Sequence, residues 1–431
     1  NLLYGKSYNS KIVNFYNIER SMDFSKIAKI WGAILIFSGT CVGAGMLALP
    51  LATAAGGFFP SLEIFILFWL TMVLTGLYII EVNLWMPEGV NLITMAKNTL
   101  GKFGLGLAWI SYLLLMYAAN SAYIAGGTPL INDTLYKLFG LRVPYIILSV
   151  ILSFLMGVIV YKGMQVLDYI NRILMIGLIV SYCLFSFNYL LDINPALLKH
   201  GQFKYILSAV PIIIASFTGH MVIPSLRTYL GNDHKSMIWT VVGGCTIPLV
   251  LYIIWQIATL GTIPFAGEHG LFAISQSSQS VADLNNQLAA KSGSYILRNA
   301  ITVFFVCALV TSFMGITLSL SDFLKDGFNV KNTKLGRITC ITSALLPPYI
   351  WSITYPGGFE VALDYAGAII GILIIILPMC MVWRGRYILN FQGEYKVPGG
   401  KVPIIMLFII GSAIIFIQFL SAFNYLPIPS V

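Results

Sequence analysis

The chain has 431 residues, of which 58% are apolar and only 10% charged, and its mean hydropathy is +0.86. Soluble domains carry about 25% charged residues, so this composition excludes a soluble globular protein and predicts one that lies in a lipid bilayer. The formal net charge is +9. The basic residues are scattered through short loops between apolar runs, which argues against a nucleic-acid partner and makes them markers of membrane topology.

The two ends of the chain and its cysteines indicate little chemistry of their own. Residues 1–28 are predicted to form a polar cytoplasmic tail, in which Met22 can be the biological start. We expect no cleavable signal peptide, because the first apolar run is too long. All the cysteines fall inside apolar segments without a Cys-x-x-Cys pair, so we expect no disulfide and no metal cluster. They are Cys41, Cys183, Cys245, Cys307, Cys340 and Cys380.

Apolar runs long enough to span a bilayer follow one another along the whole chain. A spanning helix needs about 20 mostly apolar residues, and eleven runs meet this length. They cover 29–53, 58–84, 104–127, 144–161, 169–190, 206–229, 237–261, 297–325, 337–355, 360–383 and 402–424. Pro347 and Pro348 should kink the ninth run. Short surface helices are expected at 280–290 and within 86–103.

The basic residues predict how these runs are oriented. Eleven crossings place the two termini on opposite sides of the membrane. A cytoplasmic N-terminus puts 19 of the 25 Lys and Arg residues inside, in agreement with the positive-inside bias. The six that remain outside are Lys137, Arg142, Lys199, Lys204, Lys291 and Arg298. We therefore expect a multi-pass protein of a bacterial cytoplasmic membrane with its C-terminus outside.

The first run contains the sequence GTCVGAG, which begins at Gly39 and includes Gly43 and Gly45. Glycine costs about 1 kcal/mol relative to alanine inside a helix. Loosened backbone in the hydrocarbon is tolerated only where protein or a water-filled cavity surrounds it. The motif therefore predicts a helix that is interrupted at mid-membrane and offers its peptide groups to a solute. The alternative is an ordinary close-packing face, because small residues four apart are common at helix contacts.

The sixth run carries a second weak point in ASFTGHMVIPS, residues 215–225. Pro224 removes one backbone hydrogen bond and frees a carbonyl one turn earlier. The first and sixth runs are five helices apart, so they cross in opposite directions. This predicts an inverted-topology repeat, with five helices in 29–190, five in 206–383 and an extra helix at 402–424.

Three stretches together resemble a known family. GTCVGAGMLALPLATAAGG resembles the first helix of the bacterial aromatic amino acid permeases, the tyrosine and tryptophan carriers of the APC superfamily. SFTGHMVIPSLRTYLGND and LVTSFMGITLSLSDFLKDG are similar to that family's sixth and eighth helices. The resemblance implies an all-α membrane protein with the LeuT-type fold of two five-helix repeats. It also implies ion-driven uptake of an aromatic amino acid, with tyrosine favoured. Thr218 and Met221 depart from the expected pattern.

A zwitterionic substrate needs a partner for each of its charges in a site of low dielectric. The outer half of the first helix begins near Gly43, and the N–H groups of Gly43, Ala44 and Gly45 suit a carboxylate at the positive end of a helix dipole. The outer half of the sixth helix ends near Phe217 and Thr218, whose carbonyls suit an ammonium group. No charged side chain lies at this level.

The side-chain pocket is predicted to be aromatic and lightly polar. Phe217 can stack on the substrate ring. Tyr117 and Asn120 lie on neighbouring turns of the third helix, and Thr40 lies within the first break. His220 can bond a ring hydroxyl or an indole N–H, because polar groups at this depth are costly and often functional. The alternatives are packing for the aromatic residues and a hydrogen bond within the bundle for His220.

Two coupling ions are considered. Sodium-coupled members of the fold hold a sodium ion in an oxygen cage, and the resemblance places that cage at the positions listed here. They are Gly39, Val42, Ala308, Thr311 and Ser312. The alternative is that the two hydroxyls bond their own helix. The family favours proton symport, for which His220 is the titratable group near mid-depth, followed by Glu81 and Asp322. No cofactor or metal is expected.

Charged residues also gather at the predicted cytoplasmic mouth. Arg227 and Asp322 are the candidate gate, together with Lys26, Lys29 and Lys325. An ion pair among them would close the inner side and break during alternating access. The alternative is a set of interfacial anchors whose charged ends reach the head groups.

Other function classes receive less support. An intramembrane enzyme needs a clustered nucleophile and base or a set of metal ligands, but the four histidines are dispersed and the chain has no His-Glu-x-x-His or Gly-x-Ser-x-Gly motif. Channel filters are usually built by repeated subunits or charged rings. Among transporters, the alternatives are a sodium-coupled carrier and a carrier of serine, threonine or another neutral amino acid, with Phe217 narrowing the pocket.

Overall fold

The computed structural model describes residues 26–427, and in this range every regular element is helical. The predicted start at Met22 and most of the predicted tail lie outside the described residues. Eight elements are single long helices. They are α3 (Phe58–Leu84), α4 (Leu92–Phe139), α5 (Tyr145–Lys162), α6 (Met164–Leu191), α10 (His234–Leu260), α13 (Tyr295–Gly327), α14 (Lys334–Thr354) and α17 (Val402–Ala422).

Three further stretches of spanning length are composite. The first is the helix Lys26–Cys41 followed, across a break, by α2 (Ala44–Thr53). The sixth consists of η1 (Phe203–Ala209), α8 (Val210–Ser216), η2 (His220–Val222) and α9 (Ile223–Leu230). The tenth consists of α15 (Phe359–Ile370), η3 (Gly371–Ile376) and α16 (Leu377–Tyr387). Short helices lie in the loops: α7 (Pro195–Leu198), α11 (Leu271–Ser275) and α12 (Ser280–Lys291).

Within residues 26–427, nine helical stretches are long and apolar enough to cross a membrane, and the bent pair at the start makes a tenth. The eleventh predicted crossing corresponds to α14, which is helical but carries Lys334, Arg337 and the two prolines in a less apolar run. Ten of the predicted crossings therefore have a matching apolar stretch, and the number eleven stays a prediction.

Both predicted surface helices are present. The helix α12 covers the expected 280–290 segment. The chain at 92–100 forms a helical piece that is divided from the rest of α4 at Gly101, whose φ of 74° is a left-handed value that favours glycine. Because this kink turns the helix, the first part of α4 does not continue the line of its spanning part.

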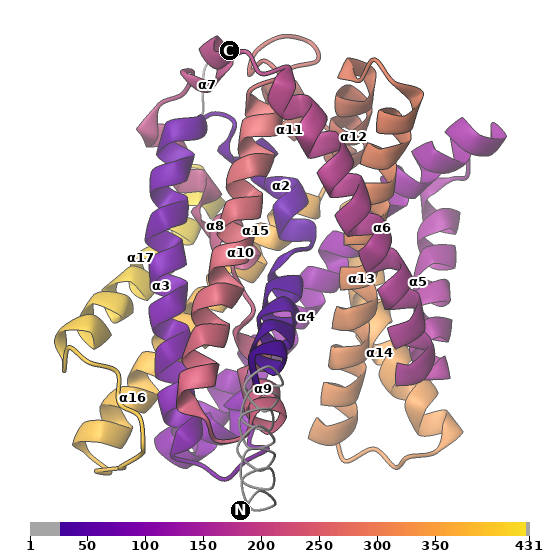
Figure 1. Cartoon of the computed structure of the whole chain (residues 1–431). Helices are drawn as coiled ribbons and strands as arrows, with labels where there is room; N and C mark the ends of the chain where they lie inside the picture. Colours follow the sequence, from indigo (N-terminus) through magenta and orange to yellow (C-terminus); the bar gives the residue numbers. More distant parts are fainter. Residues whose placement is uncertain (1–25, 428–431) are drawn as a thin grey trace, which may run out of the picture.

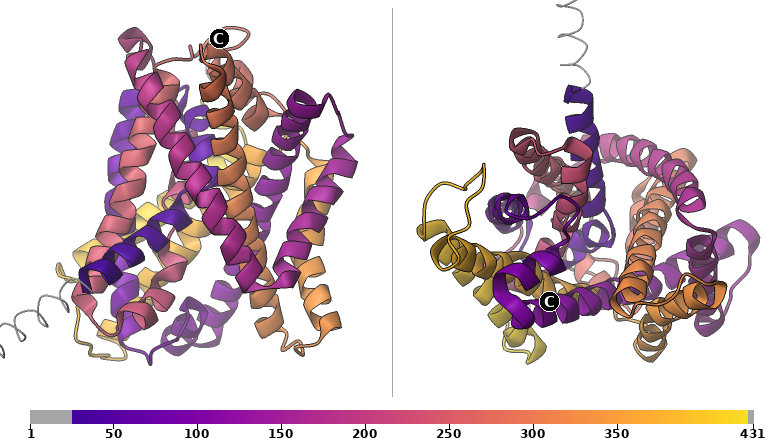
Figure 2. Two further views of the ribbon diagram at one scale, coloured as in Figure 1. Left: turned by 45° about the vertical axis from the view of Figure 1, so that its right-hand side comes forward. Right: turned by 90° about the horizontal axis from the view of Figure 1, so that it is seen from below.

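The helices form a single bundle with the two interrupted stretches near its centre (Figures 1 and 2). The helix α2 packs against α8, and α10 packs against α2 and α3. The helix α13 contacts α4 and α6, while α15 contacts α4 and α8. The helices α16 and α17 stand on one side of the bundle, and α5 and α14 on the other. This arrangement surrounds both breaks with protein.

Candidate functional site

The first break lies where the glycine motif predicts it. The inner helix ends at Cys41, α2 begins at Ala44, and the two are bent by 53°. Gly43 has an extended backbone at this junction, and its carbonyl accepts from Met46 N at 3.0 Å. The N–H groups of a helix's first turn have no intrahelical acceptor. The N-terminus of α2 thus offers donors and a positive dipole end at mid-bundle.

Two glycines of this motif lie in close contact with serines of neighbouring helices. A Cβ atom at Gly43 would lie 2.5 Å from Ser312 Oγ on α13. At Gly45 it would lie 2.5 Å from Ser216 Oγ and 3.0 Å from Ser216 Cα on α8. At Gly39, by contrast, the nearest atom would be Met175 Cε at 4.0 Å. Gly43 and Gly45 therefore allow close helix packing, as the alternative interpretation expects, and they also lie at the break.

The second break separates α8 from α9. The helix α8 ends at Ser216, residues 217–219 are not helical, and η2 leads into α9 at Ile223. Thr218 Oγ1 donates to Ile214 O at 3.0 Å, which ties the end of α8 to itself. Pro224 lies in the first turn of α9, where its missing N–H breaks no helical bond. The helix α8 thus ends next to Phe217, where the sequence predicts a helix end.

Tyr252 on α10 connects the two breaks. Its fully buried hydroxyl lies 2.8 Å from Cys41 O and 2.6 Å from Ser216 O, the carbonyls at the ends of the first helix and of α8. A hydroxyl has one hydrogen, so it donates to one carbonyl at a time. One turn away, Trp255 Nε1 donates to Met46 O in α2 at 2.9 Å.

The sequence analysis missed Tyr252 and Trp255. The available signal was their spacing, because Tyr252, Trp255 and Gln256 lie three and four positions apart and share one helix face. Gln256 Nε2 donates to Thr53 Oγ1 at 2.7 Å, so this face of α10 meets α2 along its length.

Phe217 packs inside an aromatic cluster. Its side chain is fully buried, and its ring centroid lies 5.2 Å from that of Tyr252 and 6.3 Å from that of Phe65, both in edge-on geometry. Such contacts hold α8 between α10 and α3. Stacking of Phe217 on a substrate ring stays a prediction, and in this structure the ring has protein neighbours.

His220 turns toward α3. Its Nε2 lies 2.8 Å from Met72 O and 3.2 Å from Thr75 Oγ1, and its ring meets Phe37 edge-on. A carbonyl only accepts, so Nε2 carries the hydrogen and Nδ1 is an acceptor. Nδ1 is buried without a hydrogen-bond partner. His220 therefore makes a hydrogen bond within the bundle, which is the alternative to a bond with the substrate.

Tyr117 and Asn120 face neighbouring helices. Tyr117 OH donates to Ser343 O on α14 at 2.9 Å. Asn120 Nδ2 donates to Ala344 O at 3.4 Å, and its Oδ1 accepts from Thr317 on α13 at 3.2 Å. These bonds join α4 to α13 and α14.

Another residue of α4 lies at the first break. A Cβ atom at Gly43 would be 3.7 Å from Tyr123 OH, which makes Tyr123 a neighbour that the sequence analysis did not select. Thr40 is exposed, and its hydroxyl donates to Phe37 O at 2.6 Å.

The predicted ion cage stays a prediction. Thr311 Oγ1 donates to Cys307 O at 2.8 Å and lies 3.2 Å from Ala308 O, so it bonds its own helix as the alternative reading expects. Ser312 faces Gly43, as the close contact at that glycine shows. Ala308 is fully buried, while Gly39 and Val42 are partly buried.

The candidate gate residues do not meet each other in hydrogen bonds. Arg227 Nη1 donates to Met86 O at 2.9 Å, and its Nε donates to Asn232 Oδ1 at 2.8 Å. Since Nη1 also donates to Asn83 O, the guanidinium caps the C-terminal end of α3. Asp322 is exposed on α13.

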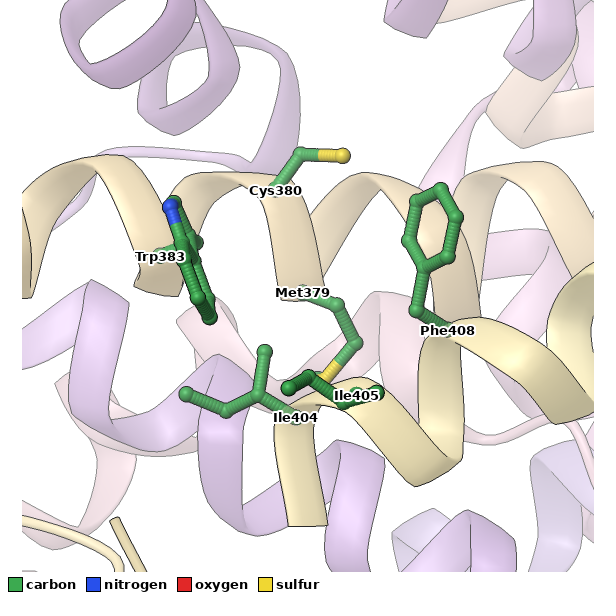
Figure 3. A pocket seen from close by; sticks show the side chains of 6 residues that line it. All are labelled: Met379, Cys380, Trp383, Ile404, Ile405 and Phe408. Atoms are coloured by element: carbon green, nitrogen blue, oxygen red, sulfur yellow. The ribbon is translucent and has the colours of Figure 1, made fainter. Parts of the chain in front are cut away.

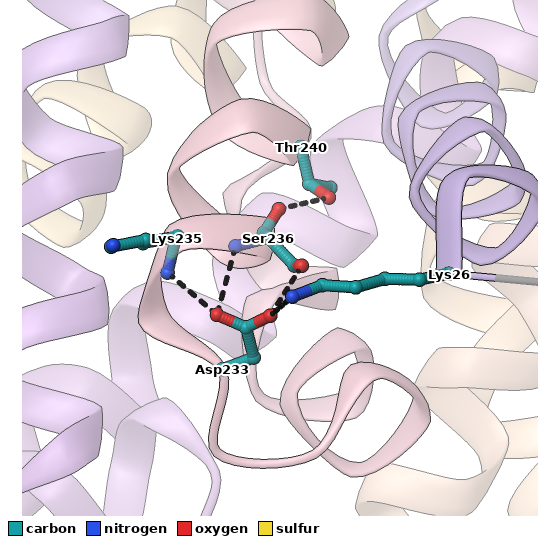
Figure 4. A network of polar contacts seen from close by, with 5 residues as sticks. All are labelled: Lys26, Asp233, Lys235, Ser236 and Thr240. Atoms are coloured by element: carbon teal, nitrogen blue, oxygen red, sulfur yellow. Dashed lines mark hydrogen bonds and ion pairs between the residues drawn. The ribbon is translucent and has the colours of Figure 1, made fainter. Parts of the chain in front are cut away.

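A different ion pair joins the first helix to α10. Lys26 Nζ lies 2.7 Å from Asp233 Oδ2 (Figure 4). Asp233 also caps α10, because its Oδ1 accepts from Lys235 N at 3.1 Å and from Ser236 N at 3.4 Å. The Lys26 ammonium is the main cause that lowers the pKa of this carboxyl to about 2. The pair thus links the start of the chain's first span to the start of the seventh.

Glu81, the second choice for a proton carrier, forms a buried ion pair. Arg386 Nε donates to Glu81 Oε1 at 2.6 Å, and Arg386 Nη2 donates to Glu81 Oε2. Val397 N donates to the same Oε2 at 2.8 Å. A carboxylate held by a fork of two N–H groups and a backbone amide makes strong charge-assisted hydrogen bonds, so Glu81 serves as an anchor between α3 and α16.

Two cavities lie at the sides of the bundle, away from both breaks. One, of about 320 Å³, is lined by Met379, Cys380 and Trp383 on α16 and by residues of α17 (Figure 3). The other, of about 480 Å³, lies between α5 and α14. Both linings are almost wholly apolar, so neither offers partners for a zwitterion.

Comparison with known proteins assigns the chain to a family. The model of the tryptophan/tyrosine permease family matches residues 26–418. The tyrosine-specific transport system 2 of Haemophilus influenzae is 32% identical over 406 residues, which is 93% of this chain and 98% of that protein. The tryptophan-specific transport protein of Pseudomonas aeruginosa is 29% identical, over 94% and 97%. The low affinity tryptophan permease of Escherichia coli is 27% identical, over 93% and 98%. This multi-pass membrane protein therefore belongs to the tryptophan/tyrosine permease family, a family of transporters and not of enzymes.

Proposed function

We propose that this protein imports an aromatic amino acid, with tyrosine favoured, across the bacterial cytoplasmic membrane by proton symport. The proposal includes a LeuT-type architecture, with five-helix repeats in 29–190 and 206–383, an extra helix at 402–424, a cytoplasmic N-terminus and an external C-terminus. The observation that carries it is the pair of adjoining helix breaks at mid-bundle, joined by Tyr252. The relatives named for tyrosine and tryptophan transport support the substrate class.

The substrate's charged groups are assigned to the backbone. The N–H groups of Gly43, Ala44 and Gly45 would bind the carboxylate at the positive end of α2. Ser216 O already accepts from Tyr252, so the carbonyls of Phe217 and Thr218 just beyond α8 are the proposed partners of the ammonium group. This assignment needs no charged side chain in the site.

The coupling proton is assigned to His220. Its Nε2 hydrogen is held by Met72 O, and its buried Nδ1 has no hydrogen-bond partner. A neutral imidazole with one unpartnered acceptor nitrogen can take up a proton. Glu81 is a weaker choice because Arg386 holds its carboxylate. His220 also lies beside the second break, so protonation there would act on the backbone proposed to bind the ammonium group.

Transport by the purified protein in liposomes tests the substrate and the ion together. An inward proton gradient without sodium is expected to drive accumulation of labelled tyrosine, and unlabelled tyrosine, tryptophan or phenylalanine should compete better than serine or threonine. Tyrosine uptake that is independent of the proton gradient but is driven by a sodium gradient would overturn proton coupling. It would favour the oxygen cage around Thr311 and Ser312. Preferential uptake of serine or threonine would overturn the aromatic substrate.

The role of His220 has a separate test. A His220→Gln variant keeps a hydrogen-bonding side chain of similar size but cannot carry a proton near neutral pH. Its uptake should lose its dependence on the proton gradient while binding of tyrosine remains. If the variant responds to the gradient as the parent protein does, the proton is carried elsewhere.

A further inference from the structure

The groove between α5 and α14 is open to the side of the bundle. These helices contact each other and stand at one edge (Figure 1). They meet at Gly157, where an added Cβ atom would lie 3.4 Å from Ile341 and Leu345. On both sides of this contact, apolar side chains such as Phe154 and Leu346 line a cavity of about 480 Å³. Phe154 is 71% exposed and Leu346 49% exposed, so the groove faces outward.

A buried hydroxyl group interrupts this apolar lining. Ser153 lines the groove, is only 8% exposed, and its Oγ has no hydrogen-bond partner. Serine in a helix usually bonds a backbone carbonyl of the preceding turn, as Ser149 does with Ile146 O at 2.9 Å. An unpartnered hydroxyl in an apolar surrounding is costly. The apolar lining therefore has one polar atom, about midway along α5.

One end of the groove is basic. Tyr161 lines the groove at this end, and the guanidinium of Arg337 lies over the Tyr161 ring, 5.4 Å from the ring centroid. Arg337 and the neighbouring Lys162 are both exposed. The ends of α5, α13 and α14 and the loop between the last two carry more basic than acidic side chains. The basic residues are Lys162, Lys325, Lys331, Lys334 and Arg337, and the acidic ones are Asp322 and Asp326.

We propose that this groove binds one anionic phospholipid. An acyl chain lies along the apolar lining past Ser153, and the phosphate lies between Arg337 and Lys162 at the basic end. Basic pockets between membrane helices at the cytoplasmic face recognise anionic headgroups in this way, and the arginine fork suits a phosphate. A zwitterionic lipid fits the apolar part equally well, so the basic end is what selects the occupant. This site lies outside the proposed transport pathway.

Native mass spectrometry of the full detergent-purified chain tests the proposal. Phosphatidylglycerol and phosphatidylcholine with identical acyl chains are added separately. The parent protein should retain the anionic lipid more strongly. Retention of phosphatidylglycerol by the double variant Lys162→Gln/Arg337→Gln should be about tenfold lower than retention by the parent protein. The matched control is Lys97→Gln/Lys102→Gln, which removes two exposed lysines from α4 and should retain the lipid like the parent.

Three results would overturn the proposal. The first is equal retention of the two lipids by the parent protein. The second is full retention of phosphatidylglycerol by the Lys162→Gln/Arg337→Gln variant. The third is a dimer, without bound lipid, that disappears when Gly157→Phe fills the groove, because the groove would then be a contact between copies of this chain. If Gly157→Phe does not fold, the Lys162→Gln/Arg337→Gln variant, whose two positions are exposed, still tests whether the groove selects the anionic lipid.

Discussion

The centre of the bundle and the end at which α3 stops are held together by different chemistry. At the centre, neutral groups bond backbone carbonyls: Tyr252 to Cys41 or Ser216, and Trp255 to Met46. At the end where α3 stops, ions are paired, as in Glu81–Arg386 and Lys26–Asp233. A neutral hydrogen bond contributes about 1 kcal/mol net, whereas breaking a buried ion pair on one side costs several times more. The centre can rearrange at low cost, while the Glu81–Arg386 end is expected to stay fixed.

The largest effect is expected from a side chain placed in the first break. Gly43→Val puts a β-branched group against Ser312 Oγ, where even a Cβ atom would lie at 2.5 Å, and it covers the N–H groups proposed to bind the carboxylate. Uptake of labelled tyrosine should fall below detection while the protein elutes as a folded monodisperse species. Gly106→Val is the control, because a Cβ atom there meets nothing within 4 Å. Normal uptake by Gly43→Val would rule out a backbone carboxylate site.

The next largest effect is expected at the buried Glu81–Arg386 ion pair. Glu81→Gln removes the charge that neutralises the buried Arg386 and should lower the free energy of unfolding by about 3–5 kcal/mol. Thermal unfolding in detergent measures the loss. The paired replacement Glu81→Leu/Arg386→Met removes both charges and should recover most of it. If Glu81→Gln unfolds at the parent temperature, the ion pair is not an anchor.

A smaller effect is expected at Tyr252. Tyr252→Phe keeps the ring contact with Phe217 but removes the hydroxyl that reaches Cys41 O and Ser216 O, which should cost about 1–3 kcal/mol because a buried carbonyl is left unpaired. The unfolding temperature and the apparent affinity for tyrosine should both change. Tyr295→Phe serves as the control, because Tyr295 is 73% exposed. An unchanged Tyr252→Phe protein would mean that the hydroxyl does not hold the breaks together.

The smallest effect is expected at the Lys26–Asp233 pair, which is partly exposed to solvent. Asp233→Asn keeps the helix cap but removes the ion pair, so the expected loss is about 0.2–1 kcal/mol near pH 7. The folded pKa of about 2 lies below the ordinary value. The carboxylate's contribution is therefore complete above about pH 4 and is lost as the pH falls toward 2.

Unfolding of the parent protein and of Asp233→Asn should thus differ near pH 7, and the difference should shrink as the pH falls below about 4. Added salt should reduce the difference at neutral pH, because exposed charges are screened. A difference that grows on acidification would contradict the lowered pKa of Asp233.

The breaks were predictable because their signals are local. Three glycines in GTCVGAG weaken a helix wherever it packs, and the first stretch is interrupted there. In the sixth stretch the break falls at residues 217–219, before Pro224, which lies in the first turn of α9. The direction in which a side chain points depends on distant partners. His220 bonds Met72, which lies 148 positions away, and Glu81 pairs with Arg386, which lies 305 positions away. Neither pairing is encoded in a local pattern.

The residues chosen on the third helix show the same limit. The depth predicted for Tyr117 and Asn120 stays a prediction, whereas their side chains are seen to bond carbonyls of α14. Tyr123, on the next turn, is the residue beside Gly43. Depth along a helix can be read from the length of its apolar run, whereas the face that meets a given neighbour requires the packing of the whole bundle.

The shared contact at Tyr252 has a consequence for how the two interrupted helices move. One phenolic hydrogen serves two acceptors on different helices, so the acceptors compete for it. When either helix end draws away, rotation about the C–O bond commits the hydrogen to the end that remains, and the departing carbonyl becomes free to receive another donor. In this way, rotation of the Tyr252 hydroxyl couples a displacement of one broken helix to the hydrogen bonding of the other.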